Sequence, residues 1–368
     1  MEHVTDERGN RHYIQKKVGE DGQGELYTTK NSDIILRINE DEPLICDNIN
    51  FLPISDVDKL ILPVDYFENG YVLNIPDGFI PLSFAMNEPS ALTLKKRLGI
   101  LTEISKVLTK LHSLPVMYGS MSPARIFISS KPSSGDAALL YSSKMDFAMR
   151  FIKESDADLY IAPESKLGQG GTTASDSYTF GALATDLLDG ATLTPELTKM
   201  LKRTQIDPKN RPKLSDLCKM FMQQFDSIVT CKKCKDDFYF DVTECPGCKS
   251  PPPRILKATL YDKVAGATTQ RGQKILEFAS HRQCFFNYHT DNVLLDSQVI
   301  PRIDCMVNVS ADRKLHLIFK NLMDKDITVN EKLVESGQAS VVALPCELIQ
   351  ISFPLFSETK RYIDMVMV

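Results

Sequence analysis

The spacing of apolar residues changes near residue 90. Between residues 11 and 86, short runs of β-forming residues alternate with turns such as Asn69-Gly70, a pattern that predicts an antiparallel sheet. From residue 90 onward, apolar residues recur three or four positions apart, which predicts an amphipathic helix that ends before Pro115. This stripe consists of Leu94, Leu98, Leu101, Ile104, Leu108 and Leu111. We therefore expect a β-rich lobe over about 11–86 and a mostly helical lobe over about 90–227.

Further helices are predicted over residues 177–189, 195–202 and 214–225, the second with Thr194 as its N-cap. A run of three prolines, Pro251-Pro252-Pro253, indicates a stiff spacer between two units. β-type runs return after it and predict a β-sandwich of about 110 residues. The expected fold class is α+β, with domains at residues 1–227, 228–253 and 254–368.

The composition is that of a folded protein with roughly two or three cores. Of the 368 residues, 43% are apolar and 25% are charged. The net charge of -5 argues against a general nucleic-acid binder, because such proteins carry a basic excess. The N-terminus is charged and no run approaches the roughly 18 apolar residues of a membrane span, so we expect a cytoplasmic protein without a membrane partner.

Four of the nine cysteines form two CxxC pairs. Cys231 and Cys234 are followed, after ten residues, by Cys245 and Cys248. Two such pairs can wrap one tetrahedral zinc ion, and the small Gly247 permits the tight turn of the second pair. Because four thiolates leave no open coordination position, we expect a structural zinc ribbon. Its lysines are offset by nearby acidic residues, which favours a docking or spacing role over nucleic-acid binding.

A glycine-rich turn lies between two β runs, at residues 18–27. Gly19, Gly22 and Gly24 lack a Cβ atom and would let backbone N–H groups approach a phosphate. A hairpin that requires positive φ angles explains the same glycines equally well. On this stretch alone, phosphate binding and a plain turn are equal alternatives.

Four motifs that follow the glycine-rich turn bear on its interpretation, because of the order in which they occur. They follow the order of the metal-binding DFG, the APE, the start of the central helix of the C-lobe, and the arginine that pairs with the APE glutamate. Residues from about 12 to 227 therefore resemble the eukaryotic-type protein kinase family, which implies a bilobal kinase-like fold. The motifs are Asp146-Phe147-Ala148, Ala162-Pro163-Glu164, Asp176-Ser177-Tyr178-Thr179-Phe180-Gly181 and Asp207-Pro208-Lys209-Asn210-Arg211-Pro212.

The resemblance implies roles for individual residues. Glu164 and Arg211 would form a largely buried ion pair, and Asp176 would bond the backbone of the catalytic loop. All three roles are architectural. If the chain binds ATP and Mg²⁺, the resemblance assigns that task to Gly19, Gly22, Gly24, Arg37 and Asp146.

Several catalytic positions depart from the family pattern. Arg37 stands in place of the strand lysine, Ser120 in place of the catalytic aspartate, and Arg125 in place of the asparagine that holds a second metal ion. A neutral hydroxyl cannot accept a proton near pH 7 as a carboxylate does, and an arginine brings positive charge to a cation site. Asp21 replaces the second glycine of the phosphate loop. Only Asp146 of the metal-binding set is retained.

These departures favour a pseudokinase without an intact catalytic set. The segment between Arg37 and Leu60 has two prolines and no glutamate after Glu42, so the helix that should hold the strand lysine is expected to be short or missing. The alternative is a divergent but active ATP-dependent Ser/Thr kinase that uses Asp146 and Arg37. A zinc-ribbon nucleic-acid adaptor is a third hypothesis.

The domain order carries a second resemblance. A kinase-like domain followed by a zinc ribbon resembles the kinase-like proteins of bacterial tellurite-resistance-type stress signalling systems. This implies a scaffold or allosteric partner, with a von Willebrand A protein and a metal-dependent protein phosphatase as its protein partners. In the last domain, residues 327–332 and 347–352 resemble the closing strands of forkhead-associated domains. The phosphothreonine-binding residues of that family have no clear counterpart here, so we expect a plain interaction sandwich.

Overall fold

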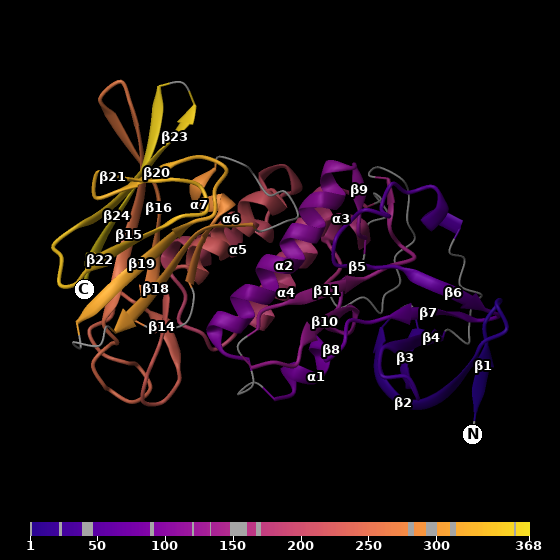
Figure 1. The fold of residues 1–368 in the computed structure, drawn as a ribbon. Coiled ribbons are helices and arrows are strands. Elements are labelled where there is room, and N and C mark those ends of the chain that lie inside the picture. Colours follow the sequence, from indigo (N-terminus) through magenta and orange to yellow (C-terminus); the bar gives the residue numbers. More distant parts are fainter. Residues whose placement is uncertain are drawn as a thin grey trace. The chain divides into compact units, whose positions relative to one another are not determined.

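The computed structural model describes residues 2–21, 24–38, 47–88, 92–119, 121–132, 134–147, 160–166, 171–278, 283–291, 300–309, 314–356 and 358–368. It is a mixed α+β structure in which strands predominate (Figure 1). The chain divides into two compact units, Met1–Met222 and Gln223–Val368. In the described part of the chain, no helix has the length and apolar character to cross a membrane.

The first unit begins with an antiparallel sheet of six strands in the order β1-β2-β3-β4-β7-β6. The sheet predicted from the alternation over residues 11–86 is confirmed. The buried residues of its central strands include Leu26, Leu36 and Leu73. The strands are β1 (His3–Thr5), β2 (Arg11–Asp21), β3 (Gly24–Thr29), β4 (Ile34–Ile38), β6 (Pro63–Phe67) and β7 (Gly70–Asn74).

The helical part of the first unit follows the predicted pattern. Helix α2 (Leu94–Ser113) buries Leu98, Leu101, Ile104, Leu108 and Leu111, and the Thr93 side chain caps its first turn by accepting from the Lys96 N–H. Helix α5 (Pro195–Thr204) has the expected cap at Thr194. Helix α4 (Thr173–Leu187) starts four residues before the prediction, because Thr172 and Ser175 form a reciprocal capping box. The other helices are α1 (Leu82–Met86), α3 (Pro163–Lys166) and α6 (Leu214–Phe225).

Short strands and turns connect these helices and carry the candidate site residues. Strands β5 (Leu60–Ile61), β11 (Ala137–Leu140), β10 (Ile126–Ser129) and β8 (Phe79–Pro81) form one small sheet. Strands β9 (Val116–Met117) and β12 (Asp146–Phe147) form another. The described residues of the unit also form the 3₁₀ turns η1 (Asp47–Asn50), η3 (Pro123–Arg125) and η4 (Pro208–Asn210).

The described part of the second unit contains two large antiparallel sheets besides a two-stranded hairpin. The larger has the order β16-β15-β24-β23-β20-β21 and the smaller the order β17-β18-β19-β22. The larger sheet consists of β15 (Ile255–Val264), β16 (Ala267–Glu277), β20 (Ile327–Val329), β21 (Lys332–Val334), β23 (Ile349–Phe356) and β24 (Thr359–Met367). The smaller sheet consists of β17 (Gln283–Phe286), β18 (Pro301–Val309), β19 (Leu315–Asn321) and β22 (Ala339–Ala343), and helix α7 (Asn287–Thr290) follows β17.

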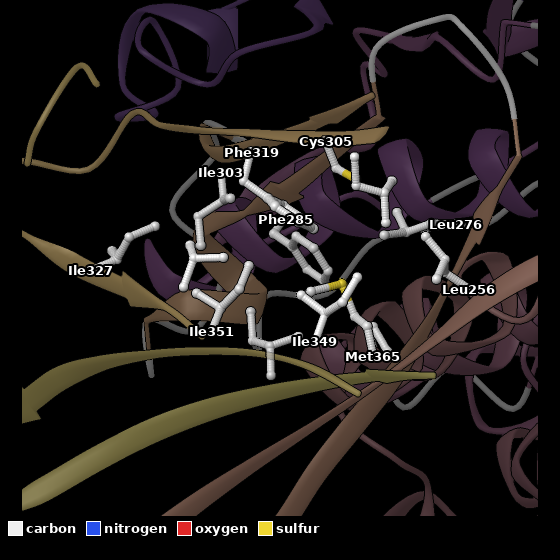
Figure 2. Close-up of a cluster of buried hydrophobic side chains, with 14 of the residues drawn as sticks. Leu256, Leu276, Phe285, Ile303, Cys305, Phe319, Ile327, Ile349, Ile351 and Met365 are labelled. Carbon is white, nitrogen blue, oxygen red and sulfur yellow. The ribbon is translucent and has the colours of Figure 1, made fainter. Parts of the chain in front are cut away.

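The two sheets share one hydrophobic core. Phe285 and Phe319 of the smaller sheet point toward Ile349, Ile351 and Met365 of the larger one (Figure 2). All five side chains are almost completely buried. Two sheets packed on one core are the layer arrangement of a β-sandwich, the fold that the returning β-type runs predict for this part of the chain.

The cysteine-rich hairpin belongs to the same unit as the sandwich. Strands β13 (Ile228–Thr230) and β14 (Asp237–Tyr239) form the hairpin, and Val229 and Phe238 share a core cluster with Ile255 and Ile275 of the sandwich. The proline run was expected to separate these parts, and that expectation is not met. The reason is that so small a hairpin cannot cover its own apolar residues, so the first sandwich strands cover them.

A buried polar cluster fixes the chain just before the hairpin. The Asp226 carboxylate accepts hydrogen bonds from the Lys274 ammonium and, at 2.8 Å, from Nε2 of His289. The other ring nitrogen, Nδ1, accepts from the Phe286 N–H at 3.0 Å, which leaves His289 neutral. Burial acts to raise the pKa of Asp226, but the charge of Lys274 and the hydrogen bonds from His289 and Lys274 together outweigh it and lower that pKa to about 2. Burial lowers the pKa of His289.

This cluster predicts an acid-sensitive second unit. Because the folded-state pKa values of His289 and Asp226 both lie below their unfolded values, the unfolded chain binds more protons as the pH falls. The histidine contribution to stability is therefore present above pH 6.5 and is lost as the pH falls below it, by up to about 1.4 kcal/mol for each pH unit. Urea denaturation of the zinc-loaded protein between pH 7.5 and pH 4.5, followed by circular dichroism, measures this slope.

His289→Gln is the matched control for that slope. A glutamine amide can donate to Asp226 and accept from the Phe286 N–H, but it does not titrate. We expect a flatter dependence of the unfolding free energy on pH in this variant. Equal slopes in the two proteins would show that His289 contributes nothing to the acid sensitivity.

Candidate functional site

Arg211 and Glu164, which the kinase resemblance pairs, are in contact in the structure. The Arg211 guanidinium donates two hydrogen bonds to the carboxylate, the one from Nη2 at 2.9 Å. It also donates to the carbonyl oxygens of Ala174 and Ile206, at 3.0 and 2.9 Å. The side chain of Arg211 is only 2% exposed and that of Glu164 12%. Burial acts to raise the pKa of Glu164, but the hydrogen bonds from Arg211, a backbone hydrogen bond and the charge of Arg211 together outweigh it, and the pKa is lowered.

Asp176 holds the turn that follows strand β9. From the first turn of α4, its carboxylate accepts from the backbone N–H groups of Tyr118 and Gly119, at 2.7 and 2.9 Å. It also lies 2.9 Å from Nε2 of His112. Gly119 has a φ of +83°, and a Cβ atom there would lie 2.5 Å from the carbonyl oxygen of Lys144. Both contacts fix the turn that leads to residue 120, and Ser120 itself lies outside the described residues.

Arg125 ends the 3₁₀ turn η3 and is completely buried. Its Nη1 donates to the hydroxyl of Ser142 at 3.2 Å, and that hydroxyl also accepts from the Lys144 N–H. The guanidinium thus lies against residues 142–144, the segment that leads into Asp146. A fixed positive charge here would compete with a metal ion for the same electrostatic role.

Asp146 lies on strand β12, opposite Met117 of β9. Its side chain is half-buried, and Oδ1 accepts from the N–H of the next residue, Phe147, at 2.7 Å. This local hydrogen bond is typical of an aspartate in a turn. The carboxylate lies on the short strand that follows the segment contacted by Arg125.

Arg37 is also completely buried, near the end of strand β4 and opposite Tyr71 of β7. Tyr71 makes an edge-to-face contact with Tyr141, with ring centroids 6.3 Å apart. The Tyr118 hydroxyl donates to the Leu140 carbonyl at 2.7 Å. These three tyrosines are completely buried. Large side chains therefore fill the interior next to strands β4 and β11.

The glycine-rich hairpin lies directly on the turn that contains Arg125. A Cβ atom on Gly19 would lie 3.4 Å from the Cβ of Ala124 and 3.5 Å from Cδ1 of Leu26. The space between Gly19 and Ala124 is thus about one methyl group deep. Gly24 has a φ of +130°, which a plain hairpin requires. Gly22 and the side chain of Asp21 lie outside the described residues.

The segment after Arg37, where a helix is expected to be short or missing, lies only partly within the described residues. Residues 39–46 lie outside it, and the 3₁₀ turn η1 follows. Ala148, the last residue of the DFG-like motif, also lies outside the described residues.

In the second unit, the four predicted cysteines come together. Their sulfur atoms all lie within 4.8 Å of one another, with 3.6 Å between Cys231 and Cys248 and 3.4 Å between Cys234 and Cys245. Four sulfurs at 2.3 Å from a central zinc ion would be about 3.8 Å apart. The cluster can therefore hold one metal ion, and its geometry is compatible with structural zinc.

The two CxxC pairs have matching backbone turns. The N–H of Lys235 donates to the Cys231 carbonyl and that of Lys249 to the Cys245 carbonyl, at 3.0 and 2.9 Å. Both lysines have positive φ angles, of 67° and 58°. Hydrogen bonds with Ser250 lower the pKa of Cys248 to about 6.

Gly247 is packed closely, in agreement with the tight turn expected there. A Cβ atom on it would lie 2.0 Å from Oδ2 of Asp236. The lysines around the cluster have acidic neighbours, and Lys249 lies 3.2 Å from Glu244. This ion pair agrees with the expectation that the acidic residues offset the basic ones.

Sequence reasoning missed Ser142, Tyr71 and Tyr141, which fill the interior beside Arg125 and Arg37. These three residues belong to no motif. The apolar residues around them predict only ordinary strands. No protein-family model matches the chain, and no curated protein matches it.

Proposed function

We propose that the chain is a signalling scaffold whose first unit is a kinase-like domain without phosphotransferase activity. The observation that carries the proposal is the approach of Gly19 to Ala124. In a kinase, the triphosphate lies between the glycine hairpin and the catalytic loop, and transfer depends on positioning and charge neutralisation there. On the side where Gly19 faces Ala124, a gap one methyl group deep would leave no room for a phosphate group.

The charges beside this gap support the same proposal. Buried Arg125 and Arg37 supply fixed positive charge, and Ser142 accepts a hydrogen bond from Arg125. The Glu164–Arg211 pair and the Asp176 contacts stabilise the architecture without touching any reacting group. A pseudokinase that binds proteins needs the residues that stabilise the kinase fold. It does not need the residues that neutralise the charge of the phosphates.

The second unit would then be an interaction module. We propose that the four cysteines bind one structural zinc ion, which stabilises the hairpin against the sandwich. The expected location is the cytoplasm of a bacterium, with a von Willebrand A protein and a metal-dependent protein phosphatase as partners. The rival function, a divergent active kinase, is favoured by one observation, the retained Asp146 carboxylate.

Nucleotide titration tests the proposal. We expect the thermal midpoint of the first unit to stay constant as ATP is raised, with Mg²⁺ or Mn²⁺ in excess so that the nucleotide does not extract zinc. A ligand that binds the native state would raise the midpoint with concentration, because binding adds to the unfolding free energy. Radiolabel transfer to the protein itself or to a generic substrate is expected to be absent.

Asp146→Ala is the matched variant for that titration. If the chain does not use a nucleotide, the wild type and the variant respond identically to ATP. A concentration-dependent rise in the wild type that the variant lacks would contradict the proposal and support the active-kinase rival. Binding of the co-expressed partners is expected to be the same for both proteins.

A further inference from the structure

Strand β22 forms one edge of the smaller sheet of the sandwich. It pairs with β19 on one side, and no other described strand pairs with it (Figure 1). Its sequence is Ala339-Ser340-Val341-Val342-Ala343, and Val341 is 60% exposed. The edge is thus open and apolar.

The register shows which backbone groups face outward. The Leu344 N–H donates to the Leu315 carbonyl, and the Asn321 N–H donates to the Gln338 carbonyl, both at 2.9 Å. In an antiparallel ladder, hydrogen-bonded and non-hydrogen-bonded pairs alternate. The even-numbered residues of β22 therefore bond to β19. The odd-numbered ones, Ala339, Val341 and Ala343, direct their N–H and C=O groups away from it.

This edge lacks the usual protection against strand pairing. Proteins blunt their edges with charged residues, prolines or bulges. Residues 339–343 contain no charge and no proline, and the register with β19 is continuous. By contrast, the edge strand β21 carries Lys332, and the edge strand β6 carries Pro63 and Asp65.

We propose that β22 pairs with β22 of a second copy of this chain, antiparallel and about a two-fold axis at Val341. The outward-facing residues read Ala-Val-Ala in both directions, so this axis places Val341 opposite Val341 and Ala339 opposite Ala343. These are the positions whose backbone groups point outward, and their pairing supplies about six interchain hydrogen bonds. The paired segments, residues 339–343 of each copy, contain no charged residue, so no like charges meet in the interface. The smaller sheets of the two copies would join into one continuous sheet. The pairing is independent of the proposed function of the first unit.

Sedimentation velocity of the zinc-loaded full-length chain tests the pairing. We expect a monomer–dimer equilibrium that shifts with protein concentration. Val341→Pro removes an outward N–H without removing a bond to β19, so the fold is retained. It should weaken dimerisation about tenfold or more, because each dimer loses two hydrogen bonds at its centre. Val341→Lys should act in the same direction by placing like charges at the axis.

Val264→Lys is the matched control, since Val264 is 42% exposed at the end of strand β15 and lies outside the proposed interface. It should leave the dimer unchanged. Hydrogen exchange gives a second readout: the amides of Ala339, Val341 and Ala343 should gain protection as the protein concentration rises. A chain that stays monomeric, a dimer unaffected by Val341→Pro, or protection that does not depend on concentration would each overturn the proposal.

Discussion

A Cys248→Ser variant is expected to lose stoichiometric zinc and to unfold the segment between Val229 and Ile255. Metal binding contributes about 10–16 kcal/mol to the folding of zinc-finger peptides, and the hairpin here is equally small. It has one short ladder, between β13 and β14, and a core cluster that includes Cys231 and Cys245 themselves. Without the metal, four thiols within 4.8 Å of one another would be held only by the local turns and this small cluster.

Elemental analysis of the purified protein measures the zinc, and hydrogen exchange locates the unfolding. In the variant, amides of β13 and β14 should exchange freely, and those at the start of β15 should lose part of their protection because Ile255 loses its cover. A chelator added to the wild type should give the same exchange pattern.

Cys346→Ser is the matched control, because Cys346 is in the same unit but outside the four-cysteine cluster, and its thiol donates to the Leu348 carbonyl at 3.1 Å. It should retain one zinc per chain and the wild-type exchange pattern. Full protection of the β13 and β14 amides in metal-free wild-type protein would contradict a structural role of the metal. The shared core would then be enough to keep the hairpin folded.

The features predicted from the sequence were those encoded locally or by fixed spacing. Each CxxC pair brings two sulfurs together within one turn, and the short β13–β14 hairpin between the pairs brings the two turns together. Helix α2 followed from its apolar stripe, and α5 from Thr194 and Pro195 at its start. The contact of Glu164 with Arg211 followed from the order of motifs in a known family, which carries long-range information that spacing does not.

The features missed depend on packing between distant segments. The approach of Gly19 to Ala124 joins residues 105 positions apart, and no local pattern specifies the depth of that gap. The Asp226 cluster joins the end of α6 to β16 and α7, and each of its residues looked like an ordinary surface or core residue. The proline run predicts a spacer between the hairpin and the sandwich. In the structure, Val229 and Phe238 of the hairpin are buried against the first sandwich strands, a long-range contact that the proline run does not indicate.

An Arg211→Ala variant is expected to destabilise the first unit by about 3–5 kcal/mol, the cost of leaving a buried ion pair without one partner. The substitution strands the Glu164 carboxylate and removes the donor to the carbonyls of Ala174 and Ile206. Urea denaturation at pH 7 measures the loss. Arg8→Ala is the matched control: Arg8 pairs with Asp65 at 3.2 Å, but its side chain is 74% exposed, so the same substitution should cost less than about 1 kcal/mol.

The pH dependence of this variant provides an independent check. Because the folded-state pKa of Glu164 is lowered below its unfolded value of 4.5, the pair stabilises the unit above that pH, and the contribution disappears as the pH falls through the folded-state pKa. The wild type should therefore lose its advantage over Arg211→Ala in acid.

The double variant Glu164→Ala/Arg211→Ala separates the ion pair from the carbonyl contacts. If the stranded carboxylate causes most of the loss, removing it as well should recover part of the stability, and the two single effects will not add. Strict additivity would mean that the pair itself contributes little, and that Arg211 stabilises the unit mainly by bonding the carbonyls of Ala174 and Ile206. In that case the Glu164–Arg211 ion pair would form as a result of folding without adding to the stability of the unit.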